Sequence, residues 1–187
     1  MTAMLVAGVA VALVALSRSG AMTIDPDKLP EGVRELLRSG AAAAKGLSNI
    51  PTDPTHLRRL VWLATVDAKL AAALREKWPQ ARRTSAYRAP AVNAAVDGAP
   101  GSLHAQGLAV DYTDGGATGD YRPWLLHVRE LVQRGEIPAP IEVIAETHPP
   151  HLHVGFRDPV DGEPKTTRWL AERGDRSKGE KRKLVVV

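Results

Sequence analysis

The chain has no cysteine among its 187 residues, and this absence narrows the chemistry open to it. Disulfides, thiolate zinc sites and cysteine nucleophiles are all excluded. Any metal ion must therefore be held by histidine and carboxylate side chains, and an oxidising compartment poses no risk to thiols. Phenylalanine occurs only once, so tryptophan, alanine, valine and leucine must build most of the core.

Long hydrophobic runs are also missing. The apolar run at residues 4–16 is shorter than the roughly 20 residues of a membrane span, but it fits a signal-peptide core of ~7–15 residues. Residues 19–21 resemble a cleavage site, although no basic residue precedes the run. We expect residues 1–21 to be a signal peptide or an uncleaved membrane anchor, and a true start at Met22 is the alternative. The first two predict export to the periplasm or cell wall, or tethering to the membrane.

The net charge of +4 arises largely from a basic segment near the end of the chain. Basic tails bind polyanions, so nucleic-acid binding is one candidate function. The segment contains neither a recognisable reading helix nor stacking aromatics, and no specific nucleic acid is expected as a partner. A solvated tail that keeps the protein soluble explains the charge equally well. The basic residues are Arg173, Arg176, Lys178, Lys181, Arg182 and Lys183.

Histidine is concentrated in one place, because three of the six histidines lie within residues 148–153. His151 and His153 are two apart in a segment that reads as a strand, so both imidazoles should project from the same face. Neutral imidazole is the commonest metal ligand and a frequent general base. The tract therefore predicts a metal or catalytic site, with a His-rich surface strand as the alternative.

Hydrophobic periodicity predicts the secondary structure. A long amphipathic helix is expected over residues 55–78, capped by Thr55 and stopped by Pro79. Strands that alternate with helices at first and pair as hairpins late in the chain indicate an α+β domain with a small antiparallel sheet flanked by helices. Further helices are expected at residues 30–37, 41–45, 90–96, 121–133 and 166–173, and strands at 83–88, 108–112 and 141–146.

Several polar and aromatic residues stand out against this pattern. Asp67 interrupts the apolar face of the long helix, so it should pair with an arginine. His56 is expected to be a surface residue and not a ligand, and His127 is expected to be exposed. Asp111 lies on the small-residue face of its strand, where a buried carboxylate needs a partner or a metal. Trp124 is expected in the core, whereas core and substrate-groove positions are both open to the tyrosines at 87 and 112.

Two separate segments resemble a known family. The first joins residues 85–96 (SAYRAPAVNAAV) to residues 102–112 (SLHAQGLAVDY), and the second is residues 148–156 (HPPHLHVGF). Together they resemble the zinc D-Ala-D-Ala peptidases of bacterial cell walls. That superfamily contains lysostaphin-type enzymes, D-Ala-D-Ala carboxypeptidases and the hedgehog amino-terminal domain. The His-x-x-His-x-His spelling is most similar to the penicillin-insensitive murein endopeptidases. The resemblance implies a hedgehog-like α+β fold and covers about residues 81–157.

The resemblance implies a metal site. His104 and Asp111 would be the first two Zn²⁺ ligands, and His153 would be the third. Two imidazoles and one carboxylate leave the fourth position open to water, which is the catalytic arrangement for zinc. Ser102, two residues before the first ligand, is expected to fix the loop and not to act as a nucleophile.

The resemblance also implies catalytic roles. His151 would be the general base or acid, and His148 would stabilise the tetrahedral intermediate or orient water. Arg88 stands where these peptidases hold an arginine that binds a substrate carboxylate, and a planar guanidinium suits that pairing. Many carboxypeptidases of the group carry Asp or Glu three residues before the last ligand. Here that position is Pro150, and Glu146 is nearby but out of register.

These expectations combine into one leading function. The protein is expected to be a zinc metallopeptidase that cleaves D-Ala-containing or cross-link bonds in peptidoglycan stem peptides, as a carboxypeptidase or an endopeptidase, in a bacterium or as a phage lysis protein. Because Pro150 stands in place of that acidic residue, an alternative function is a catalytically degenerate zinc module that binds wall peptides or a partner protein. The expected organisation is a helical part at residues 22–80 packing on the core, a zinc peptidase core at 81–160, and a basic tail at 161–187.

Overall fold

The computed structural model describes residues 14–16, 22–160, 166–173 and 183–187. The expected signal peptide or anchor at residues 1–21 therefore lies largely outside the described residues, as do positions 174–182 of the basic segment. Among the described residues, no helix combines the length and apolar character needed to cross a membrane.

A six-stranded sheet forms the centre of the protein, with the strand order β3-β4-β6-β5-β7-β8. Neighbouring strands pair antiparallel except for β5 and β7, which run parallel. A separate antiparallel pair is formed by β1 (Val14–Leu16) and β2 (Met22–Ile24). The sheet strands are β3 (Arg82–Ser85), β4 (Ala109–Thr113), β5 (Glu142–Thr147), β6 (Pro150–Gly155), β7 (Arg168–Arg173) and β8 (Lys183–Val186).

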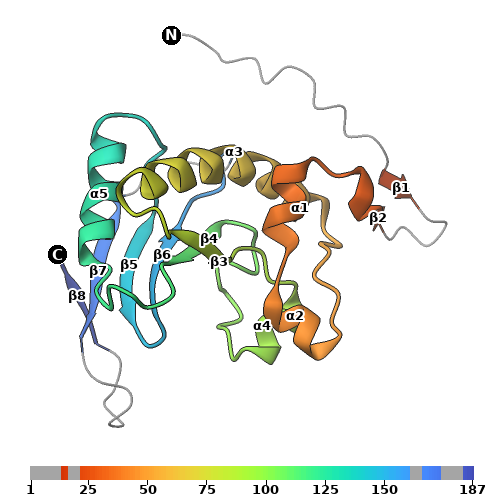
Figure 1. Ribbon diagram of the computed structural model, residues 1–187. Coiled ribbons are helices and arrows are strands. Elements are labelled where there is room, and N and C mark those ends of the chain that lie inside the picture. Colours follow the sequence, from red (N-terminus) through yellow and green to blue (C-terminus); the bar gives the residue numbers. More distant parts are fainter. Residues whose placement is uncertain (1–13, 17–21, 161–165, 174–182) are drawn as a thin grey trace.

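Helices flank this sheet, which confirms the α+β prediction (Figure 1). The longest helix, α3, runs across the sheet, and α5 lies beside β5 and β7, whereas α1, α2 and α4 gather at the opposite end of the molecule. The helices are α1 (Glu31–Leu37), α2 (Gly40–Lys45), α3 (Pro54–Lys77), α4 (Pro90–Ala95) and α5 (Arg122–Gln133), and a 3-10 turn precedes them at Pro26–Lys28.

Strand alternation divides the sheet into a core face and a polar face. Val110 and Tyr112 on β4 and Leu152 and Val154 on β6 are fully buried and join one hydrophobic cluster with α3 and α5. Asp111 and His153 alternate with these residues, so their side chains project from the opposite face. The core thus fixes the central strands from one side and leaves the other side for a polar site.

The long helix begins one residue earlier than expected. Asp53, not Thr55, is the N-cap, and its carboxylate accepts a hydrogen bond of 2.7 Å from the backbone N–H of Thr55. Pro54 occupies the first helical position, where its missing N–H costs nothing. The helix ends at Lys77, and Pro79 follows soon after, as predicted.

The helix expected at residues 166–173 is wrong, because Arg168–Arg173 forms the strand β7. This segment pairs with β5, and β8 then covers its outer side. Leu170 and Ala171 are buried there, so tertiary pairing overrides their local preference. The described parts of the predicted tail at residues 161–187 therefore extend the sheet.

The expected exposure of His127 is wrong, whereas His56 lies partly at the surface and outside the metal cluster, as expected. His127 is buried because the ring of Trp78, at the end of α3, packs edge-on against it. Trp78 stacks on Trp124 at a centroid distance of 4.9 Å and so covers a wider face of α5 than the helical period indicates. His56 is half-buried, and its Nδ1 lies 3.5 Å from the hydroxyl of Tyr87.

The large aromatic residues belong to the core. Tyr87, Tyr112 and Trp124 are all fully buried, so Trp124 lies where it was expected and the groove alternative for the tyrosines is wrong. The Tyr112 hydroxyl donates a hydrogen bond to the carboxylate of Asp67 in α3. This contact ties β4 to the helix that covers the core face.

The buried Asp67 also pairs with Arg83, which confirms the predicted ion pair. We expect Arg83→Met to lower the free energy of unfolding by about 3 kcal/mol, because it leaves a buried carboxylate without its cation. Urea denaturation in the presence of a chelator measures this loss. The same substitution in the exposed pair Arg134–Glu136 is the matched control and should change stability by less than ~0.5 kcal/mol. Equal losses in both variants would contradict the argument.

Candidate metal centre

The pairing of β4 with β6 brings two of the predicted ligands together. Asp111 and His153 are direct partners in the antiparallel register. Directly opposed residues on one face of such a pair have Cβ atoms ~4.5–5.5 Å apart. Their side chains therefore meet without any special loop, and Asp111 Oδ1 lies 2.9 Å from Nδ1 of His153.

His104 reaches the same point from the loop between α4 and β4. Its backbone N–H donates to the Ser102 hydroxyl at 3.3 Å, so Ser102 fixes the loop as expected. Gly107 closes the turn with φ +72°, and a Cβ there would lie 3.3 Å from the His56 carbonyl oxygen. His104 Nδ1 donates to the Ala86 carbonyl at 2.6 Å, because a carbonyl can only accept. That contact points Nε2 of His104 toward Asp111.

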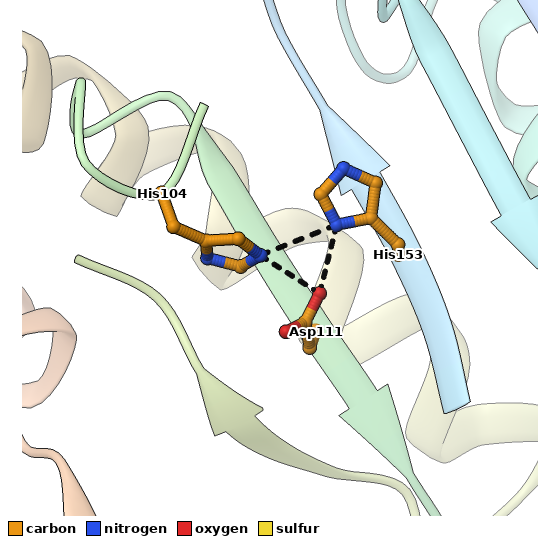
Figure 2. Close-up of side chains that lie close together, drawn as sticks. All are labelled: His104, Asp111 and His153. Atoms are coloured by element: carbon orange, nitrogen blue, oxygen red, sulfur yellow. Dashed lines mark hydrogen bonds and ion pairs between the residues drawn. The ribbon is translucent and has the colours of Figure 1, made fainter. Parts of the chain in front are cut away.

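The structure thus brings His104, Asp111 and His153 into one buried cluster (Figure 2). His104 Nε2 lies 3.0 Å from Asp111 Oδ1 and 3.2 Å from His153 Nδ1. A tetrahedral zinc ion with bonds of ~2.0–2.1 Å separates its ligand atoms by about 3.3 Å. The three atoms therefore fit such an ion after small adjustments, and the donor set of two imidazoles and one carboxylate suits zinc.

The three side chains of the cluster differ in the direction of their pKa shifts. Burial raises the pKa of Asp111, but His104 and His153 outweigh it and hold that pKa well below the usual range. Burial lowers the pKa of His104. Burial also opposes the charged form of His153, yet hydrogen bonds to Asp111 and Glu142 raise its pKa to about 9. Near neutral pH, the metal-free cluster thus holds an ionised carboxylate, a neutral His104 and a protonated His153.

Arg88 lies directly behind the cluster. Its Nη2 donates to Asp111 Oδ2 at 2.9 Å, and its Nε donates to the Ser85 hydroxyl at 2.9 Å. Arg88 therefore orients the carboxylate so that Oδ1 faces the two imidazoles, and its predicted contact with a substrate carboxylate stays a prediction.

A buried amide supports the segment that carries Arg88. Asn49 donates to the Tyr87 carbonyl at 2.9 Å and accepts from the backbone N–H of Ala89 at 2.8 Å. It thus holds the backbone on both sides of Arg88. Sequence reasoning missed Asn49, and an isolated asparagine in a loop offers no signal that would have revealed it.

The remaining predicted residues line a cleft of about 1110 Å³ around the cluster. His151 Nε2 lies 3.8 Å from Asp111 Oδ1, while its Nδ1 donates to the Pro149 carbonyl at 2.7 Å. In neutral His151, therefore, Nε2 carries the lone pair and faces the cluster. His148 also lines the cleft, with Nδ1 3.0 Å from the Thr147 hydroxyl.

A carboxylate stands beside His151, although it comes from the neighbouring strand. Glu146 on β5 is the direct partner of His151 on β6, and its Oε1 lies 3.8 Å from His151 Nε2. Its position along the sequence does not match the acidic residue of many carboxypeptidases, but the hairpin places it in the same cleft. Sequence spacing alone did not place Glu146 beside His151, because the β5–β6 register decides its position.

The comparisons with known proteins agree with this picture. The family model for peptidase M15 matches residues 32–122. The matched segment includes His104 and Asp111 and ends before the His148–His153 tract. No curated protein and no solved structure shows a significant match to the chain. The M15 peptidases are zinc-dependent, and the cluster described above is a possible metal site. The matched segment and the α+β fold together support the resemblance of this chain to the peptidase M15 superfamily of the zinc D-Ala-D-Ala carboxypeptidases.

Proposed function

We propose that this protein is a zinc-dependent peptidase that cuts peptide cross-links in bacterial peptidoglycan. The observation that carries the proposal is the buried His104–Asp111–His153 cluster with the Nε2 lone pair of His151 facing it in an open cleft. A structural zinc site would be closed by a fourth protein ligand, whereas catalytic sites keep one position open. The described residues contain no fourth side chain that joins the cluster within metal-ligand distance.

Zinc, when bound by these three side chains, lowers the pKa of a coordinated water to about 7 and polarises the scissile carbonyl. The chain's own residues supply the rest of the chemistry. His151 accepts a proton at Nε2 from the attacking water as the water oxygen bonds to the scissile carbonyl carbon. It then donates that proton to the amine that leaves. Proton transfer of this kind contributes typically ~10²–10⁴-fold to the rate.

Three further residues complete the proposal. Arg88 has five N–H donors, of which Asp111 and Ser85 use only some, so the others remain for an oxygen of the substrate. His148 lies on the wall of the cleft beyond His151, where it stabilises the oxyanion or orients water. Glu146 stabilises the positive charge that develops on His151.

The strands that line the cleft lead us to favour an endopeptidase over a carboxypeptidase. Its lining runs from Thr84 and Ser85 on β3, past the cluster on β4 and β6, to Arg168 on β7. The metal cluster therefore lies near the middle of the lined surface. A cross-linked peptide can continue past the scissile bond in both directions in such a cleft, whereas a carboxypeptidase must close one end around a terminal carboxylate.

The location of the substrate bears on the cellular setting. Peptidoglycan lies outside the cytoplasmic membrane, so a bacterial enzyme must be exported or tethered, a role that the apolar run at residues 4–16 suits. A phage enzyme would instead reach the wall at lysis. We propose an exported wall enzyme, and no specific nucleic acid is part of the proposal.

Mass spectrometry of muropeptides tests the proposed bond. We expect zinc-loaded protein to convert cross-linked dimers into monomers and to leave the terminal D-Ala of uncross-linked pentapeptides in place. Release of D-Ala alone would replace the endopeptidase assignment with a carboxypeptidase. Zinc-loaded protein that binds wall peptides but releases no product would support the non-catalytic module and overturn the proposal.

A further inference from the structure

The outward nitrogen of the third predicted ligand faces a carboxylate. His153 turns Nδ1 toward His104 and Asp111, so its Nε2 points away from the cluster. Glu142 Oε1 lies 3.4 Å from that Nε2. Glu142 and His153 stand on adjacent strands, and their diagonal position on one face brings the two side chains within reach. The Glu142 side chain is largely buried, at 16% exposure, so the contact is sheltered from water.

The residue opposite Glu142 leaves space for this contact. Gly155 is its direct partner on β6. A Cβ atom at Gly155 would lie 3.1 Å from Glu142 Cγ, 3.3 Å from His153 Nε2 and 2.4 Å from Leu103 Cδ1. Any side chain there would intrude between the carboxylate and the imidazole. The glycine is therefore part of the arrangement that lets Glu142 reach His153.

A third residue holds the carboxylate in place from the far side. Arg168 on β7 is the direct partner of Glu142 on β5, and its guanidinium bonds to Glu142 Oε2. The Arg168 backbone N–H also donates to the Ile141 carbonyl at 2.9 Å, which fixes the start of β7 beside β5. Glu142 thus uses one oxygen for Arg168 and the other for His153. Both Glu142 and Arg168 lie beyond residues 32–122, the segment matched by the family model.

We propose that Glu142 is a positioning residue that sets the zinc affinity of His153, and that Arg168 holds Glu142 in position. A carboxylate that accepts the Nε2–H of His153 leaves the lone pair on Nδ1, fixes the ring orientation and makes the imidazole a stronger ligand. The inference rests on the proposed zinc site. It gives β7 a role at the site in addition to extending the sheet.

Zinc affinity tests this role directly and does not depend on turnover. The apparent Kd of the full chain is measured by competition with a chromogenic chelator. We expect Glu142→Ala to bind zinc about 10–100-fold more weakly than the unmodified protein, as is typical when the outer partner of a ligating histidine is lost. Glu142→Gln keeps an acceptor but loses the charge, so its affinity should fall between the two. Arg168→Met should weaken binding in the same direction and by less, because its guanidinium is largely exposed.

Glu136→Gln is the matched control, since Glu136 forms an exposed ion pair with Arg134 and does not line the cleft. It should keep the zinc affinity of the unmodified protein. Circular dichroism of the metal-free variants checks the fold, and Glu142→Gln carries the test if Glu142→Ala does not fold. Tight zinc binding by the unmodified protein with equal affinity in both Glu142 variants would overturn this inference and leave the proposed function standing. Failure of the unmodified protein to bind zinc would overturn both.

Discussion

Removal of zinc is expected to abolish peptidoglycan hydrolysis, and added zinc is expected to restore it. The cleft contains no cysteine, and its histidines and carboxylates can move protons but cannot by themselves make water a strong nucleophile at neutral pH. Dye release from labelled cell walls, before and after dialysis against a chelator, measures the effect. Metal content is determined in the same samples. Full activity in a sample shown to be free of metal would reject the mechanism.

The carboxylate ligand offers a sharper version of the same test. Asp111→Asn replaces a charged oxygen ligand by a neutral amide while keeping the shape of the side chain. We expect it to lose stoichiometric zinc and all measurable hydrolysis. Asp120→Asn makes the same chemical change at an exposed position that pairs with Arg122, and it should retain both properties. An Asp111→Asn protein that holds zinc as tightly as the unmodified chain would show that the cluster is not the metal site.

Zinc binding should also depend on pH in a way that the cluster defines. The pKa of His153 is raised to about 9 in the metal-free protein, so its Nδ1 carries a proton at lower pH that must leave before zinc binds. His104, whose pKa is lowered by burial, adds no such competition near neutral pH. Apparent zinc affinity should therefore fall about tenfold per unit as pH decreases below that value, for one displaced proton. A zinc affinity that does not change between pH 7 and 8 would contradict the raised pKa of His153.

The residues that were predictable from sequence share a local pattern. His151 and His153 lie on one strand, so the period of two residues was enough to place them on one face, whereas their meeting with Asp111 was implied only by the resemblance. The pairing of Asp67 with an arginine was equally accessible, because a carboxylate on an apolar helix face requires a cation. In these cases the physical constraint acts within a few residues of the side chain concerned.

The residues that escaped prediction depend on pairing between distant segments. Glu142 contacts His153 only because β5 and β6 have a particular register, and Arg168 reaches Glu142 only because a segment expected to be helical pairs parallel to β5. His127 is buried by Trp78, which comes from the end of a different helix. Such contacts arise from tertiary packing, which outweighs local propensity and has no signature in the spacing of residues.

His151→Ala is expected to retain zinc and to lower the rate of cross-link cleavage by roughly 10²–10⁴-fold. His151 contributes no atom to the His104–Asp111–His153 cluster, so the three ligands remain in place when its ring is removed. The rate falls because the proton acceptor that faces the cluster through Nε2 is lost. Turnover of purified muropeptide dimers and zinc stoichiometry are measured on the same preparation.

His56→Ala is the matched control for this variant. His56 lies on α3 outside the cleft, where its ring contacts Tyr87, so the same loss of an imidazole should leave zinc content and turnover nearly unchanged. If His151→Ala instead stays fully active with zinc bound, the next candidate for the base is Glu146, the strand partner of His151. In that case Glu146→Gln should show the large loss of turnover, because its strand partner places it within reach of the same water and leaving group. The two variants together therefore assign the base to a histidine or to the relocated carboxylate, and both alternatives keep the reaction at the same metal cluster.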